Sequence, residues 1–116
     1  MRTPVNPVEL QTEIVAQFPG VQLELRFDPV GDLVIDKIVV PAERRERGVG
    51  SLVMDRIVAA ADAAGARLAL TPTGDFGGSV TRLRRFYRRW GFADNTGRSR
   101  DFTTRQAMLR EPDSGR

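Results

Sequence analysis

Residues 38–50 read Ile-Val-Val-Pro-Ala-Glu-Arg-Arg-Glu-Arg-Gly-Val-Gly, and no other stretch of the chain is as informative. A short apolar run stops at Pro41, a charged turn follows, and Arg45-x-x-Gly48-x-Gly50 opens a segment with helical periodicity. The first N–H groups of a helix have no partner inside it and lie at the positive end of the helix dipole, while glycines let an anion approach the backbone. The stretch therefore predicts a strand, an anion-binding turn suited to a diphosphate, and a helix.

The spacing of the glycines excludes two common phosphate-binding motifs. A P-loop needs four residues between its glycines and then Gly-Lys-Ser/Thr, and this pattern is absent. A dinucleotide-binding fingerprint needs a third glycine three residues after Gly50, where this chain has Val53. We expect main-chain N–H groups of residues 47–51 to bind the diphosphate, with charge and forked donors supplied by Arg45 and Arg47.

A second informative segment, residues 83–92, reads Leu-Arg-Arg-Phe-Tyr-Arg-Arg-Trp-Gly-Phe. Together with Arg-x-x-Gly-x-Gly it resembles the two signatures of the GNAT acetyltransferase superfamily, in the expected order and with one predicted strand between them. In that family the first signature wraps the pyrophosphate of coenzyme A, and the second is a helix that carries Phe-Tyr and ends in Gly-Phe. The resemblance covers roughly residues 33–110 and is to a short phage- or bacterial-type member.

The resemblance implies acetyl-CoA as cosubstrate and requires no metal. It implies that main chain at the end of the strand before the turn pairs with the pantetheine arm. That strand splays from the next one, so the thioester lies in a V-shaped gap with the oxyanion near the Val40 amide. The residues then expected to bind acetyl-CoA are Ile38, Val39, Val40, Arg45, Arg47, Gly48, Val49, Gly50 and Ser51.

Candidate catalytic residues follow from the second signature and from the composition. The resemblance places Tyr87 at the family's usual general-acid position, where its hydroxyl would protonate the departing CoA thiolate; a buried structural tyrosine is the alternative. Because the chain has no histidine or cysteine, a general base has to be a carboxylate, water or main chain. Asp36, on the strand leading into the gap, and Asp75, on the loop before the Tyr87 helix, are both candidates, and a structural or substrate-positioning role is the alternative for each.

A polar loop before the last predicted strand contains further candidates. Asn95, Arg98 and Asp101 lie in it, and loops on a rigid scaffold commonly choose substrates. Together with Asp75 these residues are candidates for binding the acceptor. The alternative is a solvent-exposed loop without a binding role.

The composition limits the class of protein. The 116 residues make one domain, 1–116, with residues 1–6 and 111–116 expected to be flexible tails. The absence of cysteine and histidine excludes disulfides, thiolate metal sites and His-based triads. No apolar stretch approaches the ~18–20 residues of a membrane span and the N-terminus lacks a signal-peptide core, so the cytoplasm is the expected compartment.

Charge is distributed unevenly along the chain. Residues 1–75 carry a net charge of −3, and residues 76–116 carry +6. The basic half could face an anion such as nucleic acid or the 3′-phosphate of coenzyme A. A solvated helix face that carries the arginines is the simpler interpretation.

The periodicity of the apolar residues predicts an alternation of strands and helices. Turn chemistry in residues 28–32 predicts a hairpin, and Gly65 and Ser79 are expected to end and begin helices. The fold class expected is α/β, with a GNAT-like mixed, mostly antiparallel central sheet flanked by helices and an abbreviated N-terminal part. Helices are expected at residues 7–18, 49–64 and 79–90, and strands at 21–27, 33–40, 68–70, 92–94 and 103–109.

The function predicted is N-acetyl transfer from acetyl-CoA to a primary amine by direct attack. The acceptor amine would be a small molecule or a macromolecule, and no membrane is expected to be involved. A homodimer is a further expectation, because a partner subunit could complete the abbreviated N-terminal half. Two alternatives stay open: a CoA-binding module without catalysis, and a nucleic-acid-associated protein. An acetyltransferase that acts on tRNA or on a modified base lies between them.

Overall fold

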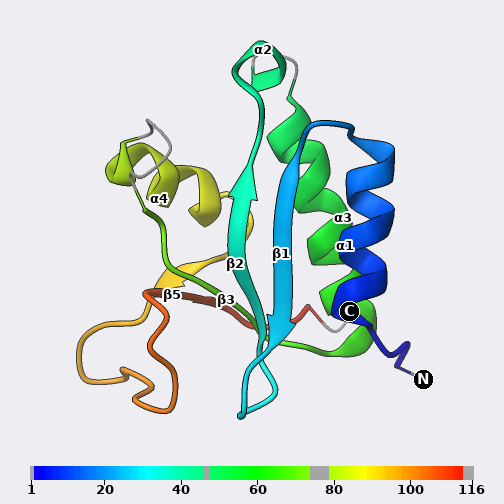
Figure 1. Cartoon of the computed structure of the whole chain (residues 1–116). Coiled ribbons are helices and arrows are strands. Elements are labelled where there is room, and N and C mark those ends of the chain that lie inside the picture. The colour runs from blue at the N-terminus through cyan, green and yellow to red at the C-terminus, as the bar shows by residue number, and fades with distance from the viewer. Residues whose placement is uncertain (1, 46–47, 74–78, 114–116) are drawn as a thin grey trace.

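The computed structural model of the chain describes residues 2–45, 48–73 and 79–113, without the side chain of Arg45. Helices and strands alternate along the chain, and a mixed sheet forms the centre (Figure 1). The elements in chain order are α1 (Pro7–Gln17), β1 (Gln22–Phe27), β2 (Leu33–Val39), α2 (Ala42–Arg45), α3 (Val49–Ala64), β3 (Leu68–Leu70), α4 (Val80–Arg88), β4 (Ala93–Asp94) and β5 (Met108–Arg110).

The sheet has the strand order β1-β2-β3-β5-β4. Only β2 and β3 are parallel, while the other three neighbouring pairs are antiparallel. The expectation of a mixed, mostly antiparallel sheet is therefore confirmed. A parallel pair requires a crossover, and α3 supplies it by running back along the sheet between β2 and β3 (Figure 1).

Helix ends fall where capping residues predict them. The side chain of Asn6 accepts hydrogen bonds from the N–H groups of Val8 and Glu9, and Pro7 takes the first helical position. Gly65, with φ of 66°, ends α3 in the left-handed region, and the Ser79 side chain accepts from the N–H of Arg82 at the start of α4. These local choices position both helices that border the site described below.

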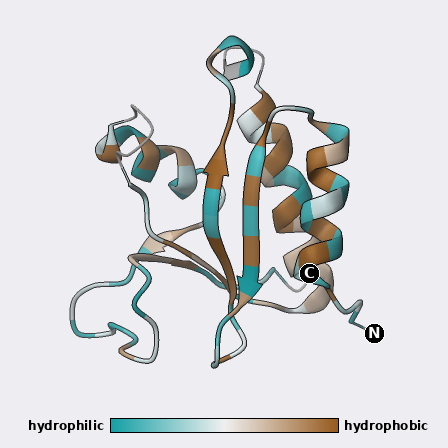
Figure 2. Cartoon of the chain, in the orientation of Figure 1, coloured by the Kyte–Doolittle hydropathy of each residue, from teal (hydrophilic) through white to brown (hydrophobic). Residues whose placement is uncertain are grey.

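Helices cover both faces of the sheet. Helices α1 and α3 lie on one side of β1 and β2, and α4 lies on the other side (Figure 1). The core is formed mainly between the sheet and α1 and α3. Apolar positions, brown in Figure 2, are frequent on β2, α1 and α3. Its fully buried large side chains are Ile14, Leu33, Val53, Met54, Ile57, Leu68 and Met108.

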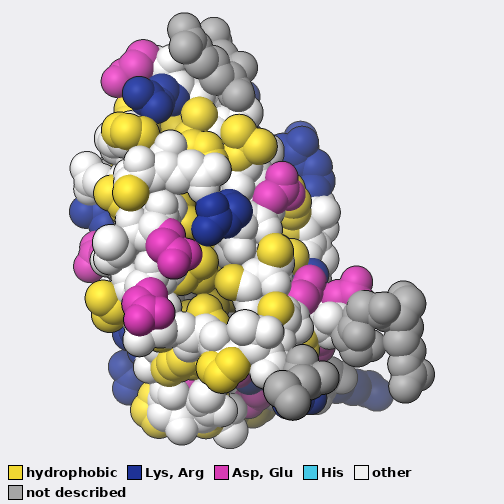
Figure 3. Space-filling model, turned by 90° about the vertical axis from the view of Figure 1, so that its right-hand side faces the viewer, with side chains coloured by type: hydrophobic (Ala, Val, Ile, Leu, Met, Phe, Trp, Pro, Cys, Tyr) yellow, Lys and Arg dark blue, Asp and Glu magenta, His cyan; other side chains and the backbone are white. Residues whose placement is uncertain are grey.

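The described part of the surface that carries α1 has no large patch that is purely apolar, purely acidic or purely basic. Figure 3 shows apolar, acidic and basic side chains intermixed on this side of the molecule. Arg56 of α3 contacts Glu13 of α1 in an exposed ion pair with a 3.6 Å N···O distance, and Val8 is two-thirds exposed.

The expected strand at 103–109 is wrong over most of its length, because only Met108–Arg110 is extended. Local side-chain bonds hold the preceding residues in turns: Asp101 accepts from the N–H and hydroxyl of Thr103, and the Thr104 hydroxyl accepts from the N–H of Gln106 at 3.2 Å. Short polar side chains of this kind compete with strand pairing. The last strand is consequently short and begins five residues later than predicted.

Both terminal segments expected to be flexible make contacts with α3. The N–H of Thr3 donates to the carbonyl of Ala63 at 2.7 Å, and the N–H of Asp113 donates to Asp62 at 2.8 Å. Asp62 also binds the Arg110 guanidinium, 2.7 Å away. Burial of Asp62 opposes its ionisation, but the bonds from Arg110 and Asp113 outweigh this and lower its pKa. Both ends of the chain are thus joined to the C-terminal part of α3.

Candidate functional site

The site begins where two parallel strands part. Strands β2 and β3 pair from Leu33 with Leu68 to Ile35 with Leu70, and there β3 ends. Strand β2 continues to Val39, paired only with β1, and a register shift opposite Glu24 and Leu25 leaves Asp36 as the extra residue of a bulge. Beyond Ile35 the β3-side edge of β2 therefore borders a gap, as the resemblance implies for the pantetheine arm.

A cavity of about 780 Å³ lies at this gap, between β2 and α4. Its volume is in the range of small-molecule and cofactor sites. Four segments line it: the second half of β2, the start of α3, the end of β3 with the residues after it, and one side of α4. The lining residues are Ile35, Asp36, Lys37, Ile38, Val39, Val40, Gly50, Leu70, Thr71, Pro72, Thr73, Ser79, Arg82, Leu83, Arg85, Phe86, Tyr87 and Arg89.

The turn before α3, which the sequence predicts to bind an anion, includes a glycine in the left-handed region. Gly48 is the N-cap of α3 and adopts φ of 72° and ψ of 18°, a left-handed conformation that disfavours other residues, and no described side chain caps the helix. The first N–H groups of α3 are therefore not used by any capping side chain that the structure describes. Arg47 lies outside the described residues, as does the side chain of Arg45.

At Gly50 the space beside the backbone, and not the backbone conformation, limits which side chain fits. Its φ is not positive, but a Cβ at this position would lie 3.7 Å from the Phe86 ring and 3.8 Å from the Val40 side chain. Alanine fits at that distance, whereas a larger side chain would enter the cavity. Of the remaining predicted turn residues, Val49 is buried and Ser51 is half-buried, and neither side chain lines the cavity.

Tyr87 lines the cavity from α4 and is buried, with 5% of its surface exposed. Its ring makes edge contacts with Phe86, at 5.3 Å between centroids, and with Phe92, at 5.8 Å. No described residue forms a hydrogen bond with its hydroxyl. Burial raises the pKa of Tyr87 to about 12, so the hydroxyl stays protonated at neutral pH.

Titration of the chain measures this pKa directly, because Tyr87 is the only tyrosine. In the folded protein we expect the ultraviolet absorbance of tyrosinate to appear with a midpoint near pH 12, against 10.0 for an unperturbed tyrosine. The folded-state pKa is the higher one, so the stability linked to this group is fully present below pH 10 and is lost as pH rises toward 12. Circular dichroism at each pH would show that the chain is still folded. A folded-state midpoint near pH 10 would mean that the hydroxyl is solvated.

The two candidate bases are placed differently. Asp36 lines the cavity at the bulge of β2, and its carboxylate accepts from Arg26 of β1 at 2.6 Å in an exposed ion pair. The structure therefore brings Asp36 and Tyr87 to one cavity. Asp75 lies outside the described residues, so its predicted roles as base and in acceptor binding stay predictions.

The arginines of α4 do not form one uniform solvated face. Arg84 and Arg88 both bind Asp94 of β4, at 2.7 and 2.8 Å, and these bonds lower the pKa of Asp94. Arg82, Arg85 and Arg89 instead line the cavity, and no described acidic residue pairs with them. The guanidinium of Arg89 also stacks on the ring of Phe86, 5.2 Å from its centroid.

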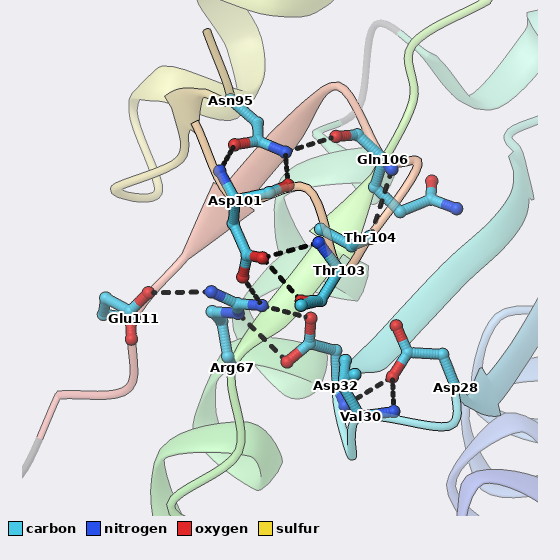
Figure 4. A network of polar contacts seen from close by, with 10 residues as sticks. All are labelled: Asp28, Val30, Asp32, Arg67, Asn95, Asp101, Thr103, Thr104, Gln106 and Glu111. Carbon is cyan, nitrogen blue, oxygen red and sulfur yellow. Dashed lines mark hydrogen bonds and ion pairs between the residues drawn. The ribbon is translucent and has the colours of Figure 1, made fainter. Parts of the chain in front are cut away.

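Asn95 and Asp101 lie in a polar network rather than in the cavity lining (Figure 4). Arg67, just before β3, donates to Asp32 at 2.7 and 3.0 Å and to Asp101 at 2.7 Å. Hydrogen bonds from Thr103 and from Arg67 lower the pKa of Asp101 to about 2. The Asn95 amide donates to the carbonyls of Asp101 and Gln106 and accepts from the N–H of Asp101. Arg98 is exposed and does not line the cavity.

This network leads to a stability prediction for Asn95, whose role in acceptor binding is still a prediction. Asn95 is buried, and alanine would leave an N–H and two carbonyls without their partner. We expect Asn95→Ala to lower the free energy of unfolding by about 2 kcal/mol in urea denaturation. Arg98→Ala, on the exposed part of the same loop, should change it by less than about 0.5 kcal/mol. An unchanged stability of the Asn95 variant would show that the network contributes little.

Several lining residues are absent from the sequence-based prediction, namely Lys37, Thr71–Thr73 and the cavity side of α4. A helical projection could have found the last of these. At 100° per residue, Arg82, Arg85 and Arg89 fall within an arc of about 60°, and Arg84 and Arg88 lie on the far side. Phe86 lies between the cationic arc and the apolar one, which explains why it contacts both Arg89 and Gly50.

Two negative findings concern the described residues. In the ranges 2–45, 48–73 and 79–113, no group of acidic residues is arranged to hold a metal ion. Among the helices formed there, none has the length and apolar character needed to cross a membrane.

No family model and no curated protein sequence matches the chain, but two solved structures are similar to it. Ard1 from Thermoplasma volcanium matches with a TM-score of 0.55 and 17% identity over 95% of this chain and 82% of that one. Naa20 from Chaetomium thermophilum, in complex with a bisubstrate analogue, matches with a TM-score of 0.52 and 18% identity over 97% of this chain and 76% of that one. At this identity the likeness shows the fold alone, and that fold is GNAT-like, as the sequence predicted.

Proposed function

We propose that this protein is an N-acetyltransferase that transfers the acetyl group of acetyl-CoA to a primary amine. The observation that carries the proposal is the cavity at the gap between β2 and β3. The glycine turn of α3 borders one side of it, and the only tyrosine of the chain lines it from α4. The likeness to Naa20 supports the proposal, because that structure holds a bisubstrate analogue within a similar fold.

In this proposal three parts of acetyl-CoA would each contact a different part of the cavity. The pyrophosphate would bind the N–H groups at the start of α3, with Gly48 shaping the turn and Gly50 leaving room. The pantetheine arm would lie along Ile38, Val39 and Val40, on the stretch of β2 that β3 does not cover. The apolar side chains of Leu70, Leu83 and Phe86 would exclude water from the thioester.

The reaction needs no covalent enzyme intermediate. The neutral amine attacks the thioester carbonyl, forming the C–N bond and a tetrahedral intermediate. Its collapse breaks the C–S bond and releases CoA as a thiolate. The nitrogen loses one proton, to Asp36 directly or through water, and the sulfur gains one, so amine and acetyl-CoA give amide and CoA thiol without other reactants.

The pKa of Tyr87 limits how the sulfur gains its proton. A thiol resembling cysteine has a pKa of about 8.5, so transfer from a hydroxyl with a pKa of about 12 is uphill by roughly 5 kcal/mol. Tyr87 would therefore act as a hydrogen-bond donor to the sulfur, and complete transfer would be coupled to return of a proton from the nitrogen. The raised pKa also keeps most of the donor protonated up to about pH 12, which includes the range in which an alkylamine with a pKa of about 10.4 becomes neutral.

A CoA-binding module without catalysis is the second candidate. The observation that favours it is the state of Asp36, the only acidic residue among the described cavity lining, because Arg26 already binds its carboxylate. Both candidates require CoA binding. Turnover on an amine separates them.

Isothermal titration calorimetry with acetyl-CoA tests the proposal first. We expect one site per chain and a rise in melting temperature, because a ligand that binds only the folded state stabilises it. A panel of primary amines, assayed by release of the CoA thiol, then tests turnover. Absence of a calorimetric signal at millimolar acetyl-CoA would contradict the proposal, and binding without turnover on any amine would favour the inactive module.

A further inference from the structure

The cationic side of α4 is not explained by binding of the pyrophosphate alone. Arg82, Arg85 and Arg89 line the same cavity as Gly50, and Lys37 lines it from β2. The pyrophosphate would already be bound by the N–H groups at the start of α3, together with any contribution from Arg45 and Arg47. The three arginines of α4 are therefore additional positive charges at the cavity.

These charges are not balanced within the described part of the protein. Asp94, the acidic residue of β4, is engaged by Arg84 and Arg88 on the other side of the helix. Asp36 lines the cavity but is paired with Arg26. Like charges on one helix side repel one another, so the arrangement favours a ligand that brings negative charge.

The spacing of the arginines extends this charge along the cavity. Arg82 and Arg89 are seven residues apart, which corresponds to about 10 Å along the helix axis. Arg89 stacks on Phe86, whose ring faces Gly50, and therefore lies toward the glycine turn. Arg82 lies at the other end of α4, close to its N-cap Ser79, which also lines the cavity.

We propose that Arg82, Arg85 and Arg89 form a second anion site in the cavity, separate from the pyrophosphate turn, which binds a phosphate or carboxylate group. This rests on the proposed function. The anionic group has two sources within one reaction, the 3′-phosphate of CoA and an acidic group on the acceptor amine. Guanidinium groups bind both by paired, charge-assisted hydrogen bonds.

The test compares CoA with 3′-dephospho-CoA on the full chain. The variant replaces the three arginines with glutamine, and Arg56→Gln is the control, because Arg56 is an exposed arginine that pairs with Glu13 on the α1 side of the sheet. If the anion is the 3′-phosphate of CoA, we expect the triple variant to bind CoA at least tenfold more weakly, with the control unchanged. If the anion is the 3′-phosphate, wild type should also bind 3′-dephospho-CoA at least tenfold more weakly than CoA, and the triple variant should not distinguish the two.

The acceptor is tested with a matched pair of amines, O-phosphoethanolamine and ethanolamine, at saturating acetyl-CoA. If the anion belongs to the acceptor, cofactor affinities stay unchanged, wild type prefers O-phosphoethanolamine at least tenfold in kcat/KM, and the triple variant loses that preference. Equal losses for CoA and 3′-dephospho-CoA would place the arginines at the pyrophosphate and overturn the second site. The second site would also be overturned if the triple variant kept its CoA affinity and wild type showed no preference between the two amines. In that case, binding of CoA and turnover by wild type would still support the proposed function.

Discussion

Replacing Gly50 with leucine is expected to lower the affinity for acetyl-CoA by 100-fold or more, about 2.7 kcal/mol. A Cβ at this position would already be in contact with Phe86 and Val40, so the branched end of leucine has only the cavity to occupy. There it would take the space next to the first N–H groups of α3, which the pyrophosphate requires in the proposed function. Calorimetric titration with acetyl-CoA measures the loss.

Gly50→Ala is the matched control for this prediction. Its Cβ would lie 3.7 and 3.8 Å from its neighbours, an ordinary van der Waals distance, so we expect acetyl-CoA affinity within about threefold of wild type. Both variants should fold, because Gly50 has no positive φ and alanine and leucine both favour helices. A leucine variant that binds acetyl-CoA as well as the alanine variant would mean that the cofactor does not approach this turn.

The order of elements could be predicted from the sequence where a local signal and the apolar period agree. Asn6 and Pro7, Gly65 and Ser79 mark helix ends by capping, and each element they bound also has a buried apolar face. Pairing between distant strands is not a local signal. A mixed sheet was predicted from the order of elements, but the parallel pairing of β2 with β3 is seen only in the structure.

The least predictable segment is the one between β4 and β5. Thr103 and Thr104 have high strand propensity, but their hydroxyls bond to Asp101 and Gln106 instead of leaving the backbone free for pairing. Arg67 fixes Asp101 from 34 residues away in sequence, which no local pattern contains. Local side-chain hydrogen bonds, together with this one tertiary contact, therefore outweigh strand propensity in this segment.

The candidate site shows the same division. Gly48, Gly50 and Tyr87 were identified from the sequence because each lies in a short motif with fixed spacing. The division of the α4 arginines depends on Asp94, which lies beyond the end of the helix and reaches Arg84 and Arg88 only after the chain turns at Gly91. The number of arginines in this segment can be counted from the sequence. Which of these arginines line the cavity depends on the fold.

Tyr87→Phe should separate catalysis from folding more clearly than any other single change. The ring contacts with Phe86 and Phe92 remain, and no described residue loses a hydrogen bond, so we expect the free energy of unfolding to change by less than about 1 kcal/mol. Acetyl-CoA affinity should also be kept, because the glycine turn is unaltered. Turnover on an accepted amine should fall by roughly 100-fold or more, since loss of one hydrogen-bond donor to the charge that develops in the transition state typically costs that much.

Trp90→Phe is the control for the Tyr87 substitution. Trp90 belongs to the same aromatic group, at 6.3 Å from Phe86, but it does not line the cavity, and its buried indole N–H has no hydrogen-bond partner. Turnover of this variant should stay within about threefold of wild type. If both variants lose turnover in proportion to stability, Tyr87 has a structural role only. If Tyr87→Phe keeps full turnover while acetyl-CoA still binds, the thiolate takes its proton from water or from the amine, and the hydroxyl does not take part in the reaction.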